Sequence, residues 1–575
     1  MESSRKKYLA HINAAPSGSE IGAYFDFDGT IIAGFSAIIF LKEKIKRGDL
    51  AIEDVMKLFF SMRQYANGNS SFYDLMVVGA GILAGTSEQK YRNFSSEMYE
   101  KEIARRIYPE SRNLIDAHLK KGHTVAIISS ATPYQIEYAA RDLGIENVLC
   151  SQYQVRNGKF TGKVRDPACF GQGKLDAAKA FSQSHGVNLS QSYFYSDSDD
   201  DLPLLQSVGY PHTINPNEKL ANIAAQQSWP VHRFTSRGKP SLSIRLRSLA
   251  VQSSFIGSYM AGLPLWALSG SKREAQNFST SLFGDLAGAL IGMKLNVRGE
   301  ENLWKRRPAV VLMNHQSKAD SIVMTKLLRR DIAGVGKKEI ANSPLLGKVM
   351  EYAGTVLIDR KNADSAIEAM KPLISVLQTE KRSVIIAPEG TRTSSTRLAP
   401  FKKGPFHLAM QAGVPIIPVV IHNTIDVCPK HDSYYRPAIV DVDVLPPIDT
   451  SQWTVETLNE HITEVRNMYL KTLGQEEDTI KKKTVLSVEK ATGKAAVSAN
   501  VKSTPKAKKT AKSKETKMPP TKTESRTSPS RSRVSAKGSK QSVGTAAQKN
   551  VATRKPGTPK SSTGGTVKEH KSGTE

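Results

Sequence analysis

The chain has 575 residues, of which 39% are hydrophobic and 23% are charged, and its formal net charge is +27. This length exceeds what one hydrophobic core organises, and the composition excludes a fibrous or wholly disordered protein. Three cysteines without CxxC spacing (Cys150, Cys169 and Cys428) exclude a disulfide framework and a zinc ribbon, and favour a reducing compartment.

Most of the positive charge belongs to the C-terminal end. Residues 481–575 hold 24 Lys and Arg against 5 Glu and no Asp, so this segment carries +19 of the +27. Its Lys/Ser/Thr/Pro-rich composition predicts a disordered tail over 476–575. Such a tail attracts polyanions, including an anionic membrane surface, or simply aids solubility. It has hardly any aromatic side chains, so specific nucleic-acid binding is not predicted.

The N-terminal part predicts an α/β domain over 20–232. The first twenty residues have no apolar core, so no cleaved secretory signal is expected. Short apolar runs at Ile21–Phe27 and Thr124–Ile128 are typical of strands, whereas residues 34–110 show helical periodicity with little strand signal. This pattern predicts a helical insertion between the first two strands of the sheet.

Two carboxylates follow the first predicted strand, Asp26 and Asp28 in the run YFDFDGT at 24–30. If the backbone turns there, both face one pocket, where one attacks phosphorus and the other gives a proton to the leaving oxygen. Acidic turns with glycine are common, so the motif alone leaves a purely structural turn equally open.

Three further features occur after later strands. Ser129 offers a hydroxyl to a phosphoryl oxygen after the strand TVAII, and Lys174 in GQGK offers a positive charge to the same dianion. Asp197 and Asp201, in YFYSDSDDDLPLL, suit Mg²⁺ through oxygen ligands. Taken singly, Lys174 is more typical of a solvated surface and Ser129 of a turn. The ordered set instead indicates a phosphate-ester site.

In this order the motifs resemble those of the haloacid-dehalogenase superfamily, particularly its phosphoserine-phosphatase-like branch. The resemblance covers residues 20–232 and implies a Rossmann-like parallel sheet with a helical cap at about 34–110. It implies Asp26 as the nucleophile, Asp28 as acid and then base, and Ser129 and Lys174 as phosphoryl ligands. It also implies Mg²⁺ held by Asp26, Asp197 and the Asp28 carbonyl, with Asp201 supporting the site.

Two positions depart from that pattern. Phosphoserine phosphatases carry a glutamate nine residues past the nucleophile, at the mouth of the cap, that binds the serine ammonium; here the position is Phe35. The fourth motif reads SDSDDD where GDSxxD is usual, which keeps the carboxylates. Phosphatase chemistry is therefore expected on a less polar ester than phosphoserine, such as a lipid or glycerol phosphate.

Residues 233–296 predict a basic link and then two apolar helices at Leu249–Leu268 and Leu282–Met293. The first is interrupted by Gln252, several serines and Pro264, and the second is too short to cross a bilayer. We expect the pair to lie in the membrane interface, with nearby basic residues at anionic headgroups. A pair of buried core helices is the alternative.

An α/β pattern returns over 297–475, with strand candidates AVVLM, TVLID, SVIIA and PIIPVVI. His315 comes after the first of these, and Asp320 lies five residues later. The carboxylate then fixes the imidazole tautomer, and the imidazole takes the proton of an alcohol that attacks a thioester. An isolated H-x₄-D pair arises often by chance, so the pair alone does not establish a catalytic site.

Several phosphate-binding signals support the pair, in a fixed order along the chain. The run PEGTR at 388–392 places Glu389, Gly390, Thr391 and Arg392 together, where glycine lets the backbone approach a phosphate and arginine binds it with two hydrogen bonds. Arg360 in GTVLIDR and Lys338 in GKKE add charge for the same anion, and FKKG and VPIIP complete the set.

This ordered set resembles the glycerolipid acyltransferase family, most of all the 1-acylglycerol-3-phosphate acyltransferases. The resemblance implies His315 as the general base, Asp320 as its orienting partner and residues 389–392 as the acceptor-phosphate site. It also implies acyl-CoA or acyl carrier protein as the donor and a lysophospholipid as the acceptor.

The leading interpretation is a bifunctional, membrane-associated enzyme of phospholipid biosynthesis, with its catalytic domains facing the cytoplasm at a bacterial inner membrane. One alternative keeps only the acyltransferase and makes the N-terminal domain a non-catalytic phosphate-sensing or scaffolding module. A membrane–polyanion adaptor driven by the tail is a third, which leaves both motif series unexplained.

Overall fold

The computed structural model describes residues 2–358 and 371–475. Within these ranges the chain builds two α/β bodies, each around its own sheet, which are described separately. The basic tail at 476–575 and Arg360 lie outside the described residues, so the predictions made for them remain predictions.

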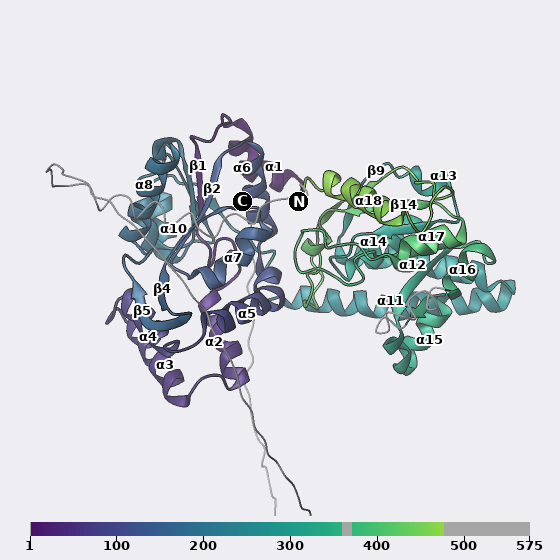
Figure 1. Cartoon of the computed structure of the whole chain (residues 1–575), viewed down its shortest axis with the longest axis horizontal. Coiled ribbons are helices and arrows are strands. Elements are labelled where there is room, and N and C mark those ends of the chain that lie inside the picture. Colours follow the sequence, from purple (N-terminus) through teal and green to yellow (C-terminus); the bar gives the residue numbers. More distant parts are fainter. Residues whose placement is uncertain (1, 359–370, 476–575) are drawn as a thin grey trace, which may run out of the picture. The chain divides into compact units, whose positions relative to one another are not determined.

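The first sheet has six strands in the order β3-β2-β1-β6-β7-β8, and every neighbouring pair is parallel (Figure 1). The two predicted strands are neighbours in this sheet, as β1 and β2. The strands are β1 (Gly22–Phe25), β2 (Thr124–Ser129), β3 (Asn147–Cys150), β6 (Tyr193–Ser196), β7 (Tyr210–Ile214) and β8 (Val231–His232).

Both faces of this sheet are covered by helices, so its strands are apolar throughout rather than alternating with polar residues. Phe25 and Ile127 pack on one face and Tyr24 and Ile128 on the other. One layer consists of α1 (Glu2–Ala14), α6 (Pro109–Lys120) and α7 (Pro133–Asp142). The other consists of α8 (Gln172–His185), α9 (Leu202–Leu205) and α10 (Glu218–Gln226).

The predicted helical insertion is confirmed between β1 and β2. It comprises α2 (Ser36–Arg47), α3 (Ile52–Ala66), α4 (Phe72–Ile82), α5 (Glu88–Met98) and two further turns at Tyr99–Ile103 and Ala104–Arg106. A hairpin of β4 (Gln152–Arg156) and β5 (Lys159–Arg165) packs against α4 and was not predicted. Its turn has positive φ at Asn157 and Gly158, and Asn-Gly is the dipeptide that favours such turns.

The second sheet has seven strands in the order β12-β11-β13-β10-β14-β15-β9, with only β14 and β15 antiparallel. Four were predicted: β10 (Val310–Met313), β12 (Val356–Ile358), β13 (Ser383–Ile386) and β14 (Ile416–Ile421). Three were not: β9 (Lys294–Arg298), β11 (Ile332–Lys337) and β15 (Ile439–Val444). β9 alternates polar and apolar residues at the sheet edge, and β11 contains two glycines, so neither reads as an apolar run.

Helices cover both faces of this sheet as well. One layer has α16 (Lys371–Gln378), α17 (Gly404–Ala412) and α18 (Leu458–Thr472). The other has α11 (Leu242–Ser269), α12 (Lys272–Ile291) and α14 (Ala319–Leu328). Short helices α13 (Asn302–Lys305) and α15 (Pro344–Tyr352) lie in the connections.

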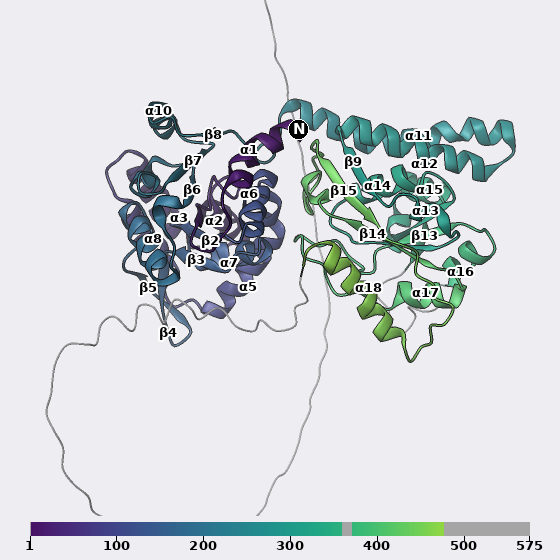
Figure 2. The same cartoon turned by 90° about the horizontal axis from the view of Figure 1, so that it is seen from above.

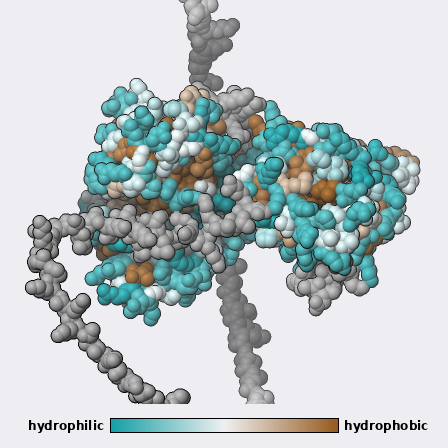
Figure 3. All heavy atoms as spheres, turned by 45° about the horizontal axis from the view of Figure 1, so that its top comes forward, coloured by the Kyte–Doolittle hydropathy of each residue, from teal (hydrophilic) through white to brown (hydrophobic). Residues whose placement is uncertain are grey.

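The predicted apolar pair forms α11 and α12, which run side by side with α12 between α11 and α14 (Figures 1 and 2). α12 buries Phe283, Ala287 and Ile291 in the core. α11 exposes Leu242, Leu246 and Leu249 along one side, and hydrophobic residues reach the surface of both bodies (Figure 3). Among the described residues, no helix is long and apolar enough to cross a membrane.

A cluster of histidines lies on the face of the first sheet that α1 and α6 cover. His11 and His118 each lie within hydrogen-bonding distance of the Tyr195 hydroxyl, at 3.1 and 2.9 Å. The His11 ring stacks on His212 with 4.3 Å between centroids. Burial lowers the pKa of His11 to about 4 and holds the pKa values of His118 and His212 well below their usual value.

Acidification should therefore destabilise this body. The unfolded chain protonates its histidines near their ordinary pKa of about 6.5, whereas the folded cluster resists protonation. The stability that the neutral histidines provide is complete above about pH 6.5. It is lost as the pH falls toward 4, the pKa of His11. The measurement is urea unfolding of the full chain across this range.

His11→Phe keeps an aromatic ring against His212 and should reduce the pH slope of unfolding by about one bound proton. Tyr210→Phe, at an exposed aromatic residue of the same body, removes no histidine, so it is the control and should leave the slope unchanged. A denaturation midpoint that does not move with pH would contradict this account.

Candidate active sites

The predicted phosphoryl site lies at the carboxyl ends of three adjacent strands. Asp26 follows β1, Ser129 ends β2 and Asp197 follows β6, and these strands are neighbours in the order β2-β1-β6. Parallel strands open a crevice at this edge, which is where α/β sheets bind ligands. All three side chains are mostly buried, and the Ser129 hydroxyl accepts a hydrogen bond from the Ala131 amide at 3.3 Å.

Lys174 and Asp201 join this group as predicted. Lys174 lies in the first turn of α8, and its ammonium donates to Asp26 Oδ1 and Asp201 Oδ2, both at 2.8 Å. Burial lowers the pKa of Lys174, but the Asp201 and Asp26 carboxylates raise it by more, so the ammonium stays charged. Ser196, which the sequence did not single out, donates to Asp201 Oδ2 at 2.6 Å and fixes that carboxylate.

Asp28 is held by the start of the cap. Its two carboxylate oxygens accept hydrogen bonds from the Ser36 amide at 2.8 Å and the Ser36 hydroxyl at 2.9 Å. Burial raises the pKa of Asp28 to about 7, although the bonds from Ser36 act in the opposite direction. A carboxyl group with this pKa exchanges a proton near neutral pH, as a general acid and base must. Phe35, immediately before Ser36, is exposed.

The four carboxylates of this site outnumber its buried ammonium group. Burial raises the pKa values of Asp26 and Asp197, and their mutual repulsion adds to the effect at Asp197. Within residues 2–358 and 371–475, Asp201 Oδ1 is buried and has no hydrogen-bond partner. The donor set therefore fits a hard divalent cation such as Mg²⁺, which binds carboxylate and carbonyl oxygens.

Within the described residues, no three His, Cys, Asp or Glu side chains form a metal-binding group. The set expected from the resemblance contains only two carboxylate side chains and one backbone carbonyl. Gly29 has φ +77°, and a Cβ there would lie 2.0 Å from Asp197 Oδ2, so glycine is needed for that carboxylate to approach the loop after β1.

The second predicted site forms at the carboxyl end of β10. His315 follows that strand after Asn314, and its Nδ1 lies 2.7 Å from Asp320 Oδ2 at the start of α14. The same oxygen accepts the amides of Gln316 at 2.8 Å and Ser317 at 2.9 Å. Asp320 is fully buried, whereas the imidazole is partly exposed. The carboxylate thus holds the proton on Nδ1 and leaves Nε2 to accept one.

Two residues that sequence reasoning missed support this pair. The Thr424 hydroxyl, on the turn after β14, donates to Asp320 Oδ1, and its side chain is fully buried. The Asn314 amide group bonds the backbone of Ile421 in both directions, at 2.8 and 2.7 Å. Asn314 directly precedes His315 in the sequence, but nothing there links Thr424 to Asp320, because that contact joins residues 104 positions apart.

Glu389 of the PEGTR run faces the protein. Its carboxylate accepts the backbone amides of His315 at 2.7 Å and Ala399 at 3.1 Å, and only 4% of the residue is exposed. Burial raises the pKa of Glu389 to about 7, although these two hydrogen bonds act against the shift. This side chain therefore fixes the position of the His315 backbone.

Arg392 has the features of an anion ligand. Its Nη1 is buried and makes no hydrogen bond with the described protein atoms. Gly390 has φ +73°, and a Cβ there would lie 2.9 Å from the end of the Lys402 side chain, so a second cation lies over the same loop. Thr391 is exposed, and Lys338 is exposed just beyond β11. Arg360 lies outside the described residues.

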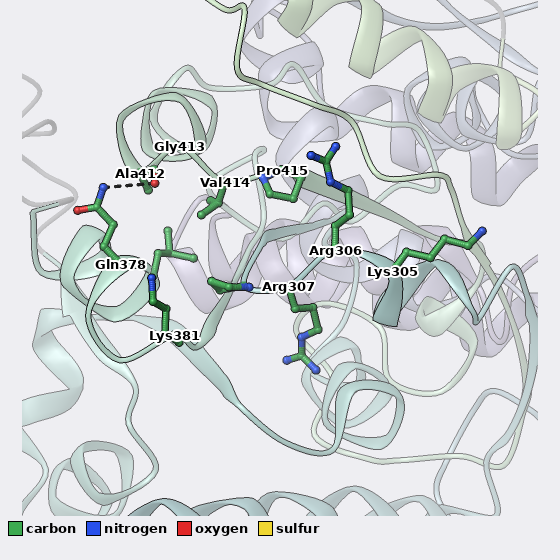
Figure 4. A pocket seen from close by; sticks show the side chains of 11 residues that line it. Lys305, Arg306, Arg307, Gln378, Lys381, Ala412, Gly413, Val414 and Pro415 are labelled. Carbon is green, nitrogen blue, oxygen red and sulfur yellow. Dashed lines mark hydrogen bonds between the residues drawn. The ribbon is translucent and has the colours of Figure 1, made fainter.

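A separate basic pocket of about 400 Å³ lies at the opposite end of the strands. It is lined by Arg306, Arg307 and Lys381, and by residues that precede β10 and β14. Helices α16 and α17 both end there, so these cations compensate the negative ends of two helix dipoles. Figure 4 shows the Arg306 and Arg307 guanidinium groups pointing in different directions. This pocket is not assigned to the reaction.

Comparison with known proteins agrees with the two sites. The family described as acyltransferase matches residues 294–422, and the family described as haloacid dehalogenase-like hydrolase matches residues 23–206. A 1-acyl-sn-glycerol-3-phosphate acyltransferase of Limnanthes alba is 36% identical over 197 residues, which cover 34% of this chain and 69% of that protein. The chain belongs to the 1-acyl-sn-glycerol-3-phosphate acyltransferase family, with a haloacid dehalogenase-like hydrolase domain before it.

The hydrolase domain has its own relatives. A putative hydrolase of Mycobacterium leprae is 31% identical over 222 residues, which cover 38% of this chain and 74% of that protein.

Among solved structures, the 1-acyl-sn-glycerophosphate acyltransferase PlsC of Thermotoga maritima is 24% identical, with a TM-score of 0.36, over 41% of this chain and 96% of that one.

Removing the Thr424 hydroxyl should impair the acyltransferase domain. Thr424→Val keeps the shape but leaves Asp320 Oδ1 buried without a donor, which costs about 1–3 kcal/mol. We expect kcat for acyl transfer to fall roughly tenfold to a hundredfold with KM little changed. Thr424→Ser retains the hydroxyl and should restore most of the rate. An equal loss in both variants would mean that the rate responds to any change of side-chain shape at this position, which would contradict the role assigned to the hydrogen bond.

Proposed function

We propose that the acyltransferase domain transfers an acyl group from a thioester to the free hydroxyl of 1-acylglycerol 3-phosphate, which gives phosphatidic acid. The observation that carries this proposal is the His315–Asp320 pair, whose buried carboxylate holds Nδ1 at 2.7 Å while the imidazole reaches the surface. The donor is acyl-CoA or acyl carrier protein, which both present the acyl group as a thioester.

The proposed reaction needs no nucleophile from the protein. His315 Nε2 takes the proton of the acceptor hydroxyl as its oxygen attacks the thioester carbonyl, and Asp320 stabilises the resulting imidazolium. The tetrahedral intermediate then collapses, the carbon–sulfur bond breaks and the thiolate recovers the proton from the imidazolium. The new ester and a free thiol leave the site.

The acceptor phosphate is assigned to Arg392, whose buried Nη1 has no hydrogen-bond partner among the residues that the structure describes. Lys402, over Gly390, adds a second cation, and Thr391, Lys338 and Arg360 remain candidates to line the same site. Glu389 was expected at this phosphate, but both of its oxygens accept backbone amides. We assign it to holding the His315 loop, because a carboxylate facing a phosphate would repel it.

For the hydrolase domain we propose an aspartate-nucleophile phosphatase. Asp26 attacks phosphorus, the ester oxygen leaves with the proton of Asp28, and Asp28 then takes a proton from the water that attacks the aspartyl-phosphate. Lys174 and Ser129 bind the phosphoryl oxygens. Asp26, Asp197 and the Asp28 carbonyl would hold Mg²⁺, with Asp201 supporting them, and the ion would neutralise charge on the transferred group.

We also propose that the chain works at a membrane surface. The exposed leucines of α11 lie beside the exposed Arg245 and Arg247, a combination that suits the interface with anionic headgroups. The cytoplasmic face of a bacterial inner membrane is the proposed site.

Substitutions at the two sites should separate the activities. His315→Ala removes the base and should lower acylation of lysophosphatidic acid by at least about a hundredfold, without changing phosphate release. Asp26→Asn removes the nucleophile and should abolish Mg²⁺-dependent phosphate release alone. In one assay, labelled oleoyl-CoA reports the acylated lipid, and the released phosphate is measured in the same samples. If wild type acylates but releases no phosphate from a panel of esters, the first domain is a phosphate-sensing or scaffolding module instead.

Arg392→Gln tests the phosphate assignment. Loss of a charge-assisted hydrogen bond should raise KM for 1-acylglycerol 3-phosphate roughly tenfold to a hundredfold. With 1-monoacylglycerol, which has no phosphate, wild type and variant should perform alike because the missing contact is absent from both. A similar loss on both acceptors would mean that Arg392 supports the fold of the loop rather than the ligand.

A further inference from the structure

An apolar surface lies on the cap of the hydrolase domain and is not explained by the chemistry above. On α3, four large side chains are exposed: Ile52 (84%), Met56 (63%), Phe59 (65%) and Phe60 (63%). Their spacing of four, three and one residues places them on one side of the helix. α4 packs against α3 and adds the exposed Tyr73 and Val77. These six residues are called the cap face.

Single exposed apolar residues are ordinary, but a contiguous group of large ones on one helical hairpin marks a surface that something covers. A different side of α3 packs into the domain, because Ser61 is buried there and Val55, Leu58 and Met62 are partly buried. The cap helix is therefore apolar on two sides.

The same hairpin touches the phosphoryl site. The Tyr65 hydroxyl, near the end of α3, donates to Asp200 at 3.4 Å, and Asp200 precedes Asp201. Phe72, the first residue of α4, stacks on Phe170 with 4.5 Å between ring centroids. Phe170 precedes Gly171, the residue before the helix that carries Lys174. The turn end of the hairpin, which follows Phe60 and precedes Tyr73 of the cap face, therefore contacts the loops that carry Asp201 and precede Lys174.

We propose that the cap face docks on the surface of a lipid bilayer, and that the phosphatase thereby acts on phosphate monoesters of membrane lipids. This inference rests on the proposed phosphatase function and names its substrate class. Exposed Phe35 at the mouth of the cap, where phosphoserine phosphatases carry a glutamate, agrees with an ester that brings no ammonium group.

Charge around the cap face favours a bilayer over a second copy of this chain. The side chains of Lys46 and Lys57 are 79% and 64% exposed, whereas their acidic partners Glu43 and Asp54 are only 21% and 30% exposed. Lys57 follows Met56 of the cap face on α3, so its exposed ammonium group is available to a phosphate headgroup beside that face. A symmetric dimer through this face would bring the Lys57 side chains of two copies into one interface. Aromatic and basic side chains around an apolar helix face are typical of interfacial binding.

The first test compares a membrane-borne substrate with a soluble one, using the full chain. Phe59→Ser/Phe60→Ser should lower kcat/KM for phosphatidic acid in phosphatidylcholine vesicles by about tenfold or more, because two aromatic side chains that become buried in the bilayer on docking are lost. Hydrolysis of soluble p-nitrophenyl phosphate should not change. Tyr210→Ser, at an exposed apolar residue of β7, is the matched control and should change neither rate.

Two results would overturn the proposal in this assay: unchanged hydrolysis of vesicle-borne phosphatidic acid by the double variant, or an equal fall on both substrates. The proposed phosphatase function fails separately, if wild type releases phosphate from neither substrate. Docking itself is then still tested by a measurement that needs no turnover.

That measurement locates the cap face relative to the acyl chains. Phe59→Trp and Tyr210→Trp are compared with the parent chain on vesicles with brominated acyl chains, which quench nearby tryptophan. The proposal expects added quenching for Phe59→Trp alone. It is overturned if Phe59→Trp is not quenched, or if light scattering shows a dimer that Phe59→Ser/Phe60→Ser dissociates, which would assign the face to a second copy of the chain.

Discussion

Parallel strands end at the same edge of a sheet, and both sites of this chain depend on that constraint. In the hydrolase domain, β2, β1 and β6 bring Ser129, Asp26 and Asp197 together although they are separated by up to about 170 positions. In the acyltransferase domain, β10 and β14 are neighbours, so His315 and Thr424 meet through Asp320. Helices on both faces bury the strands, which leaves this edge as the place where polar side chains reach a ligand.

Buried carboxylates serve opposite purposes at the two edges. Asp320 is surrounded by donors: an imidazole, two amides and a hydroxyl satisfy both of its oxygens, so its charge is stable without a metal. The hydrolase site instead concentrates carboxylates around the single ammonium of Lys174 and leaves Asp201 Oδ1 unpaired. Such an arrangement is costly until a cation and a phosphoryl group enter. One site is complete as folded, and the other is completed by its ligands.

The sequence predicted both sheets and the cap, because apolar strand runs and helical periodicity are local patterns. It also placed candidate site residues after those strands, and their roles remain predictions. It did not predict β9, at the sheet edge, β11, which contains two glycines, β15, in which aspartates alternate with apolar residues, or the hairpin at 152–165. The supporting residues Thr424, Ser36 and Ser196 were also missed. Each acts through a side-chain hydroxyl that donates to a carboxylate of one of the two sites, and a serine or threonine has no local pattern that reveals such a partner. The inward direction of the Glu389 side chain was not predictable for the same reason, since it is set by tertiary contacts.

The same functional group, a phosphate monoester, meets different surroundings in the two proposed reactions, and this difference decides its fate. Near Arg392 the Glu389 carboxylate is turned inward and occupied by two amides, so it does not face the phosphate that we assign to Arg392. The phosphate is therefore held intact while the hydroxyl reacts. At the other site the Asp26 carboxylate shares Lys174 with the incoming dianion, and the ammonium reduces the repulsion between them enough for attack on phosphorus. The placement of one carboxylate, inward or toward the ligand, thus separates phosphate recognition from phosphate transfer.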